Sequence, residues 1–348
     1  MKAVLLRRGN SGEPEARVEE MPVPEAATGE LLVEMKACGL CGTDIEKLRG
    51  QYTAAMPVLG HEAVGTVTEA DQDSGGFRRG DRVFPHHHVP CYSCHFCTHG
   101  SETMCADYRN TNLDPGGLSE VFRVPRANVS RGGVIRLSAS VSDILATMIE
   151  PLACCIRAIG RAGAHPGDSA LVVGAGPVGL THALLLRSMH ARVFITDVAR
   201  PRLEFAERID AGEAIDAAKR DAPSEVRAGT AGRGADIAIV ASGSPAAAVQ
   251  ALKSVRRGGT VCLFGIPFEG SQLDYSLSGV YNSEITIIPS YGAVEKDTAR
   301  AHDMLATGEL DLKPLMTHTF PLERFHEAVR AATSGDAIKV VLTSSHGR

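Results

Sequence analysis

Four closely spaced cysteines are the residues of this sequence that most clearly point to chemistry. The segment CYSCHFCTHGSETMC holds four of the nine cysteines, separated by two, two and seven residues. Thiolates at this spacing can converge on one tetrahedral zinc ion from a single loop. Because four sulfur ligands leave no open coordination position, such a site stabilises a fold and performs no catalysis. The residues predicted to bind this structural zinc are Cys91, Cys94, Cys97 and Cys105.

Two other uses of these thiols stay open. Four cysteines also hold iron–sulfur clusters, and thioredoxin-type motifs also space cysteines by two residues, although a redox pair needs only two thiols. A nucleic-acid-binding zinc finger is disfavoured, because the chain carries a formal net charge of −5 and no run of Lys or Arg accompanies the cysteines. The four cysteines are therefore interpreted as a closed zinc site, with an iron–sulfur cluster and a redox pair as alternatives.

A glycine-rich segment predicts a dinucleotide site. In LVVGAGPVGLTHALL, a strand pattern leads into G-x-G-x-x-G and then into a helical pattern. The first glycine allows a tight turn, the second lets the backbone approach a pyrophosphate, and the third lets the helix pack on the strand. The helix N-terminus offers free N–H groups to the phosphates. The residues predicted to bind the cofactor here are Gly174, Gly176, Pro177, Val178 and Gly179.

An acidic residue after the next apolar run predicts which dinucleotide binds. Asp197 ends RVFITD, about where a carboxylate can accept hydrogen bonds from the adenine ribose. The same carboxylate would repel the 2′-phosphate of NADP, so the predicted cofactor is NAD. Arg200 and Arg202 follow closely and leave NADP open, and Arg202 counts among the candidate cofactor contacts. A glycine turn with a purely structural use is the competing interpretation of the motif.

Three further segments carry residue types that bind metal. GLCGTDIE contains Cys41, VLGHEAVG contains the adjacent His61 and Glu62, and MIEPLACC contains Glu150. A catalytic zinc needs a few protein ligands and one vacant position for water or substrate. These segments are therefore the candidates for a second, open metal site.

The hydrophobic pattern indicates the elements that must position these groups. Residues 1 to about 140 show short apolar runs interrupted by Gly, Pro and Asp, which is typical of a β-rich domain. From about residue 152, apolar strands alternate with helical patterns, which predicts a parallel sheet with helices on both faces. From about residue 290, two helical patterns and the strand AIKVVLT could return the chain to the first domain.

Length and composition fit a soluble globular protein of two domains. The chain has 348 residues, 44% of them hydrophobic. No apolar run approaches the roughly 18 residues that a membrane span requires. The N-terminus MKAVLLRRGN lacks the apolar core and cleavage site of a signal peptide, so a cytoplasmic location is expected. In a reducing compartment, clustered thiols bind metal more often than they form disulfides.

Taken together, the motifs resemble one enzyme family. The motifs CGTD, GHE, the four-cysteine loop, EPLA, VGAGPVG and IKVVL occur in the order found in zinc-dependent medium-chain dehydrogenases/reductases, the alcohol dehydrogenase superfamily. The resemblance covers nearly the whole chain and points to the branch of sorbitol and threonine dehydrogenases. It implies an α/β fold with two domains. One is a GroES-like, β-rich catalytic domain of residues 1–152 completed by 290–348, and the other is a doubly wound Rossmann domain with a parallel sheet, binding NAD, at 153–289.

The resemblance also implies a catalytic site. Cys41 and His61 would ligate zinc, and Glu62 would be the third ligand or its close neighbour. Glu150 stands where liver-type alcohol dehydrogenases have a cysteine, and in the polyol branch this glutamate contacts zinc directly or through water. Thr43 would receive the proton of the alcohol and pass it on. Zinc makes a bound alcohol more acidic, and NAD takes the hydride.

Further predictions concern the residues around this catalytic site. Some relatives end their proton relay with a histidine where this chain has Glu46, so the exit route of the proton stays open. His86, His87 and His88 are expected to be structural or to line the pocket wall. The neighbours Cys154 and Cys155 are expected to be core residues. The loop residues expected to border the substrate are Tyr52, Arg109, Asn110, Asn112 and Tyr291.

The branch implies a secondary alcohol as substrate, oxidised to a ketone. The short segment between CGTD and GHE differs from the pattern of threonine dehydrogenases, so the resemblance favours a polyol, cyclitol or aminocyclitol over a hydroxy amino acid such as threonine. Two competing hypotheses are a non-catalytic redox sensor that binds zinc and nucleotide, and a zinc-free quinone reductase, which would lack these ligands. A homo-oligomer is expected, with a tetramer favoured over a dimer, and neither nucleic acid nor membrane is an expected partner.

Overall fold

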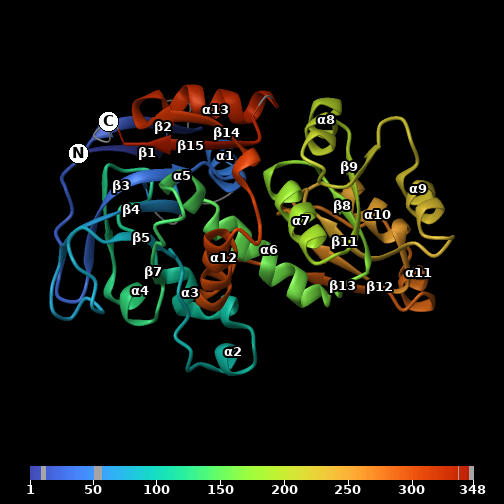
Figure 1. Cartoon of the computed structure of the whole chain (residues 1–348), viewed down its shortest axis with the longest axis horizontal. Helices are drawn as coiled ribbons and strands as arrows, with labels where there is room; N and C mark the ends of the chain where they lie inside the picture. The colour runs from blue at the N-terminus through green and yellow to red at the C-terminus, as the bar shows by residue number, and fades with distance from the viewer. Residues whose placement is uncertain (9–12, 51–56, 336, 345–348) are drawn as a thin grey trace. The chain divides into compact units, whose positions relative to one another are not determined.

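The chain folds into two compact units, described here from a computed structural model that covers residues 1–8, 13–50, 57–335 and 337–344. The first unit comprises Met1–Ala153 and Ala293–Arg348, and the second comprises Cys154–Gly292. In Figure 1 the blue N-terminal and red C-terminal parts belong to the same unit, while the yellow middle of the chain forms the other. In the part of the chain that is described, no helix is long and apolar enough to cross a membrane.

The first unit is built on a mixed β-sheet with the order β14-β15-β3-β4-β5-β7, and β6 also pairs with β3. A separate antiparallel pair joins β1 to β2. The strands are β1 (Lys2–Arg8), β2 (Pro14–Glu20), β3 (Leu31–Gly39), β4 (Glu62–Ala70), β5 (Arg82–Pro85), β6 (Val121–Val124), β7 (Val134–Arg136), β14 (Met316–Pro321) and β15 (Lys339–Thr343).

Strand β3 is the centre of this unit because it pairs with three neighbours and is buried along most of its length. Its apolar residues Val33 and Met35 pack in one core with Phe122 and Phe325, which come from β6 and from a C-terminal helix. The C-terminal strand β15 runs antiparallel to β3, so the two ends of the chain share one sheet. The described fold therefore brings the last strand next to the segments that carry the candidate metal ligands.

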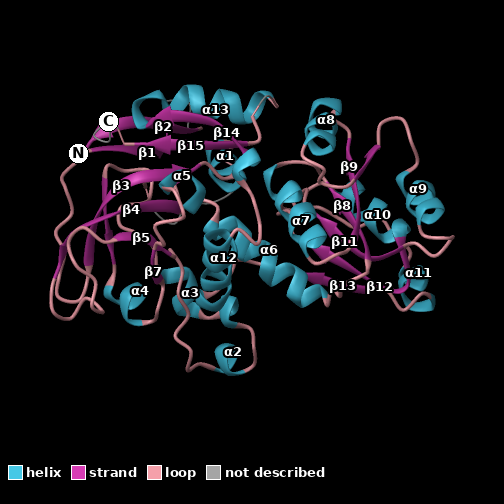
Figure 2. Cartoon of the chain, viewed as in Figure 1, coloured by secondary structure: helices cyan, strands magenta, loops and turns pink. Residues whose placement is uncertain are grey.

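Short helices and turns fill the connections of the first unit, and two longer helices come from its C-terminal part (Figure 2). The helices are α1 (Gly42–Leu48), α2 (His95–Thr98), α3 (Ala106–Asn110), α4 (Arg126–Ser130), α5 (Asp143–Ala146), α12 (Glu295–Thr307) and α13 (Phe325–Ser334), with 3₁₀ turns η1 (Glu102–Met104), η2 (Lys313–Leu315) and η3 (Leu322–Arg324). Helix α6 (Ile149–Ala162) begins in the first unit and ends in the second.

The second unit is a six-stranded sheet in the order β10-β9-β8-β11-β12-β13, and all its pairs are parallel. The strands are β8 (Ser169–Val173), β9 (Arg192–Asp197), β10 (Glu213–Asp216), β11 (Ala235–Val240), β12 (Val255–Leu263) and β13 (Thr286–Pro289). The helices between them are α7 (Pro177–Ser188), α8 (Arg200–Arg208), α9 (Ala222–Gly229), α10 (Pro245–Ser254) and α11 (Leu277–Asn282). The predicted doubly wound parallel sheet is confirmed.

Burial follows the predicted pattern in the second unit. Leu171, Phe194 and Val261 lie in β8, β9 and β12 and share one apolar core. Strands buried on both faces read as continuous apolar runs, and β8 is buried at every residue. The sequence analysis predicted no element at α11, β13 or β14. These elements are short, and their residues show no clear hydrophobic periodicity.

Candidate functional site

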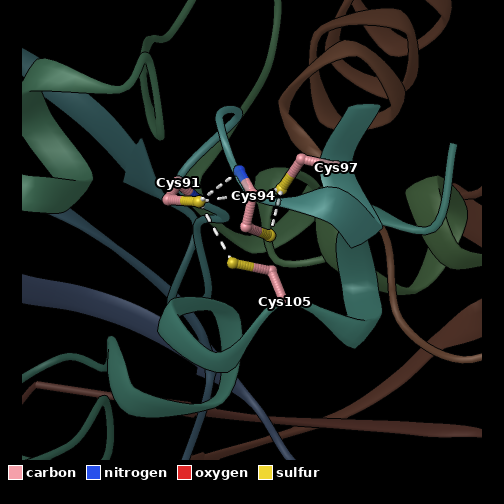
Figure 3. A group of neighbouring side chains, drawn as sticks. All are labelled: Cys91, Cys94, Cys97 and Cys105. Carbon is pink, nitrogen blue, oxygen red and sulfur yellow. Dashed lines mark hydrogen bonds between the residues drawn. The ribbon is translucent and has the colours of Figure 1, made fainter. Parts of the chain in front are cut away.

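The four predicted cysteines lie together in one loop (Figure 3). Their four sulfur atoms lie within 4.8 Å of one another. The Cys91 and Cys97 sulfurs are 3.9 Å apart, and the Cys94 and Cys97 sulfurs are 3.5 Å apart. A tetrahedral zinc with Zn–S distances of about 2.3 Å separates its sulfur ligands by about 3.8 Å. The cluster therefore fits a closed zinc site.

Local backbone turns aim N–H groups at the sulfur atoms. Cys94 directly precedes α2, and its backbone N–H donates to the Cys91 sulfur at 3.3 Å. The hydroxyl and the backbone N–H of Ser93 also donate to Cys91, and these bonds lower the pKa of the Cys91 thiol to about 6. Burial has the opposite effect on Cys97 and raises its pKa to about 12. Backbone donors of this kind favour the thiolate form that binds metal.

A second group of metal-binding atoms comes from Cys41, His61 and Glu62, whose candidate ligand atoms also lie within 4.8 Å of one another. Cys41 precedes α1, His61 directly precedes β4, and Glu62 begins β4, where it pairs with Gly39 of β3. Sulfur, nitrogen and oxygen donors from three side chains fit a zinc site that keeps a vacant position. Glu150 is buried in α6 and is not a member of this group.

Asp44 supports this second group and was not among the site residues predicted from the sequence. Its side chain is completely buried, and its carboxylate lies 3.7 Å from Nδ1 of His61. It also accepts hydrogen bonds from the backbone N–H groups of Cys41 at 3.2 Å and Gly60 at 3.3 Å. Burial lowers the pKa of His61, but the charge of Asp44 overcomes this and raises it well above its usual value. The sequence feature that could have identified Asp44 is its position as the acidic residue of the CGTD motif.

Lys339 is a second residue of the site that the sequence did not predict. Its ammonium is buried, pairs with Glu62 and also donates to the carbonyl of Leu40 at 3.4 Å. Burial raises the pKa of the Glu62 carboxyl, although Lys339 counteracts part of that rise. A side chain on Gly39 would collide with the Glu62 carboxylate, so glycine leaves the space it needs. One oxygen of Glu62 is thus already engaged by a cation.

The three consecutive histidines lie beside this group. His87 is 9% exposed, and its ring centre is 5.0 Å from that of His61. Burial lowers the pKa of His87 well below its usual value. Nδ1 of His88 donates to the Thr111 carbonyl at 2.6 Å, and burial lowers the pKa of His88 to about 3. His86 is completely buried.

The remaining predicted residues are placed as follows. Thr43 is half-buried in the first turn of α1. Glu46, on the same helix, pairs with Arg49 at 3.1 Å. Cys154 and Cys155 are buried in α6, as predicted for core residues. Tyr52 lies outside the described residues. The other candidates are exposed or half-buried. Arg109 and Asn110 were expected on a loop but lie in the short helix α3, while Asn112 follows this helix and Tyr291 lies just before the end of the second unit.

The glycine-rich segment joins β8 to α7 within the second unit. Gly174 has a φ of +107°, which favours glycine, and a side chain on Gly179 would collide with the Gly174 carbonyl. Gly176 directly precedes the helix and Pro177 occupies its first turn, where a missing N–H costs nothing. Val178 follows in the same turn. This local geometry is the one that the phosphate-binding pattern requires.

Asp197 ends β9 next to this turn. Its carboxylate accepts hydrogen bonds from the backbone N–H groups of Ala175 and Ala199, both at 2.8 Å. Arg202 lies 3.6 Å from the same carboxylate. Each carboxylate oxygen can accept a further bond, so the side chain keeps capacity for a ribose hydroxyl. Its fixed position at the glycine-rich turn distinguishes it from an ordinary surface acid.

Comparison with known proteins agrees with this architecture. The alcohol dehydrogenase GroES-like domain family matches residues 27–132, and the zinc-binding dehydrogenase family matches residues 177–307. A sorbitol dehydrogenase of Halalkalibacterium halodurans is 31% identical over 347 residues, which is 99% of each chain. An L-threonine 3-dehydrogenase of Pectobacterium atrosepticum is 30% identical over 349 residues, covering 98% of this chain and 94% of that protein.

A solved structure gives the same result for the fold. An alcohol dehydrogenase from Escherichia coli CFT073, in complex with NADH, superposes with a TM-score of 0.84 at 27% identity and covers 99% of both chains. The two family matches together reach both units of the fold, and the relatives and the solved structure each cover nearly the whole chain. The chain therefore belongs to the zinc-dependent medium-chain dehydrogenases/reductases of the alcohol dehydrogenase superfamily, in the branch that includes sorbitol and threonine dehydrogenases.

Proposed function

We propose that this protein oxidises a secondary alcohol of a polyol, cyclitol or aminocyclitol to a ketone, with NAD as hydride acceptor. The observation that carries the proposal is the group formed by Cys41, His61 and Glu62, which offers three donors of the types that hold a catalytic zinc. The similarity to a sorbitol dehydrogenase along the whole chain supports a polyol as substrate class.

The two units would have different functions, one in catalysis and the other in cofactor binding. We assign residues 1–152 and 290–348 to a GroES-like catalytic domain and residues 153–289 to a Rossmann domain that binds NAD. These limits lie within a few residues of the limits of the two compact units. The first domain would hold both metals, since all candidate ligands lie in it.

The catalytic metal site would consist of Cys41, His61 and Glu62, with Glu150 as an additional or water-mediated ligand. The charge of Glu150 acts on Glu62 and raises its pKa, which supports a place near the group. Structural zinc would be bound by Cys91, Cys94, Cys97 and Cys105. When bound, zinc supplies the Lewis acidity that lets an alcohol ionise near neutral pH, and NAD supplies the hydride acceptor.

The side chains around the metal group have separable tasks. The Asp44 carboxylate faces Nδ1 of His61 and holds the ring in one orientation, which leaves the other ring nitrogen for the metal. Lys339 balances the charge of Glu62. Thr43 would take the proton of the alcohol at its Oγ1 and release its own hydroxyl proton to water, since it is half-buried at the start of α1 and follows Cys41 by two residues.

The cofactor would lie on the glycine-rich turn of the second unit. Gly174 makes the tight turn, Gly176 would let the backbone approach the pyrophosphate, and Gly179 lets α7 pack closely on the turn. Pro177 and Val178 begin the helix that offers N–H groups. Asp197 would accept the ribose hydroxyls, and Arg202 lies 3.6 Å from that carboxylate. A carboxylate at this place favours NAD over NADP.

A threonine-type hydroxy amino acid is the second candidate substrate, favoured by the 30% identity with an L-threonine 3-dehydrogenase. A non-catalytic redox sensor that binds zinc and nucleotide is a third hypothesis, which the second metal group disfavours. We propose a homotetramer or dimer that works in the cytoplasm, where clustered thiols stay reduced.

One experiment tests the function directly. Purified protein loaded with zinc is given NAD and a panel of polyols, cyclitols, aminocyclitols, threonine and simple secondary alcohols, and NADH formation is followed by absorbance. The proposal expects turnover on one polyhydroxylated class and two zinc ions per chain. Turnover on threonine alone would favour the second candidate. Absence of turnover together with one zinc ion per chain would favour the sensor.

A further inference from the structure

The four-cysteine loop region contacts the segment by which the chain re-enters the first unit. The hydroxyl of Tyr108 in α3 donates to the Ala293 carbonyl at 2.7 Å and accepts from the Ala293 N–H at 3.2 Å. Lys296 lies 3.7 Å from Glu102. Tyr92, between Cys91 and Cys94 on the loop, donates its hydroxyl to Glu295. The segment from Ala293 to the start of α12 is thereby fastened at three positions to the four-cysteine loop and to helix α3 that follows it.

Glu295 contacts both the four-cysteine loop and a buried histidine outside it. One carboxylate oxygen accepts from Tyr92, and the other is buried with no hydrogen-bond partner among the described residues. That second oxygen lies 3.7 Å from Nδ1 of His86, whose side chain is completely buried. Both ring nitrogens of His86 also lack a partner within the described ranges. Because unpaired buried polar atoms are costly, the facing positions of these two groups indicate a functional pair.

The rings of His86 and His87 connect Glu295 to His61, a predicted ligand of the catalytic metal. The His86 ring meets the His87 ring edge-on at 5.3 Å between centres. The His87 ring in turn lies 5.0 Å from the His61 ring. Closely packed rings transmit a displacement because the protein interior has few voids into which a side chain can move. A chain of contacts therefore runs from Tyr92 on the metal loop to a predicted zinc ligand.

We propose that Glu295 is a positioning residue that couples the four-cysteine loop to the catalytic site. Tyr92 fixes the Glu295 carboxylate, Glu295 fixes the His86 ring, and His86 sets the tilt of His87 against His61. The four-cysteine loop thus contributes to alcohol binding as well as to stability. This inference rests on the proposed function for the identity of the catalytic site, and its contacts lie wholly within the first unit.

A simple clamp between α12 and the loop is the competing explanation, and the structure provides a matched control for it. The Lys296–Glu102 pair joins the same helix to the same region, and neither of its two residues is one of the histidines or their partner Glu295. Lys296 is 70% exposed at its side chain, so replacing it leaves the interior untouched. Tyr92 is 47% exposed and has a φ of +58°, which is unfavourable for any residue other than glycine. Phenylalanine has the same backbone preference as tyrosine, so Tyr92→Phe removes only the hydroxyl.

The test compares Tyr92→Phe, Glu295→Gln and Lys296→Met with the parent in the zinc-loaded enzyme. We expect the first two variants to raise the alcohol KM about fivefold, with the NAD KM within about twofold, on the order of one lost hydrogen bond. Lys296→Met should match the parent in both constants. Equal effects in Tyr92→Phe and Lys296→Met, or no effect in Tyr92→Phe and Glu295→Gln, would overturn the proposal.

A second readout separates this inference from the proposed function. In protein with Co²⁺ at the Cys41–His61 site and zinc in the four-cysteine loop, the visible absorption bands of cobalt report ligand geometry without turnover. The bands should shift in Tyr92→Phe and Glu295→Gln and stay constant in Lys296→Met. Unchanged bands in all three variants would reject the coupling. An inactive parent whose bands still respond in this pattern would reject only the proposed reaction.

Discussion

At the scale of single residues, buried charge organises the candidate catalytic site. Asp44 is completely buried, yet its carboxylate faces His61 and two backbone N–H groups. Lys339 is 3% exposed and meets Glu62. A buried charge is tolerated only when it is paired and hydrogen-bonded, so each of these groups depends on its partner. The site is consequently sensitive to substitutions that keep shape but remove charge.

Asp44→Asn tests this dependence. The amide has nearly the same size but loses the negative charge that holds His61, so zinc affinity of the catalytic site should fall by roughly 10- to 100-fold. Chelator competition with zinc counted per chain measures it, and the four-cysteine zinc should stay bound. Asp71→Asn is the control, because Asp71 also accepts backbone N–H groups in this unit, at Gly29 and Asp73. Equal zinc loss in both variants would contradict the assigned role of Asp44.

Thr43→Val separates proton transfer from metal binding. Valine keeps the shape of threonine and removes the hydroxyl, and Thr43 is half-buried in α1 without being a metal-binding residue type. We expect turnover to fall about 10²-fold, the usual effect of losing a positioned proton-transfer group. Zinc content should remain at the parent value. A variant that keeps full turnover would remove Thr43 from the mechanism.

At the scale of elements, motifs confined to one turn were predictable and contacts between distant segments were not. The β8–α7 turn and the four-cysteine loop each follow from a short spacing, because their side chains are neighbours in the chain. The Lys339–Glu62 pair joins residues 277 positions apart and depends on β15 lying beside β3. No local period in the sequence specifies that pairing. Asp44 belongs to the CGTD motif, but its role beside His61 can be recognised only from the folded structure, which brings the two side chains together.

The end of β9 makes a prediction about cofactor choice. Asp197 is held by the N–H groups of Ala175 and Ala199, so its charge is fixed at the glycine-rich turn. Asp197→Ala should weaken discrimination against NADP by about tenfold or more, because the repulsion of the 2′-phosphate is removed while Arg202 remains. The ratio of kcat/KM for NAD and NADP measures it. An unchanged ratio would assign cofactor selectivity to other residues.

At the scale of the whole molecule, the edge of the second sheet points to assembly. Strand β13 is the last strand of the six-stranded order and pairs within the described chain only with β12. The preceding helix α11 exposes Leu277 by 83% and Tyr281 by 81%, and Phe268 is 51% exposed nearby in sequence. An unpaired edge next to exposed large apolar side chains is unfavourable in a lone chain, so a second copy is the expected cover.

Leu277→Asp tests this assembly. A charge in an apolar interface between copies is strongly unfavourable, so the variant should have a smaller assembly mass than the parent. Light scattering after size-exclusion chromatography measures the mass against the 36.8 kDa of one chain. Val23→Asp is the control, because Val23 is 50% exposed but lies in the first unit, away from α11 in the sequence. A parent mass of one chain would refute the oligomer, and equal masses of parent and Leu277→Asp would place the interface elsewhere. Because an interface through the β13 edge would join the sheets of two copies, loss of assembly in Leu277→Asp should also lower the unfolding temperature of the second unit more than Val23→Asp does.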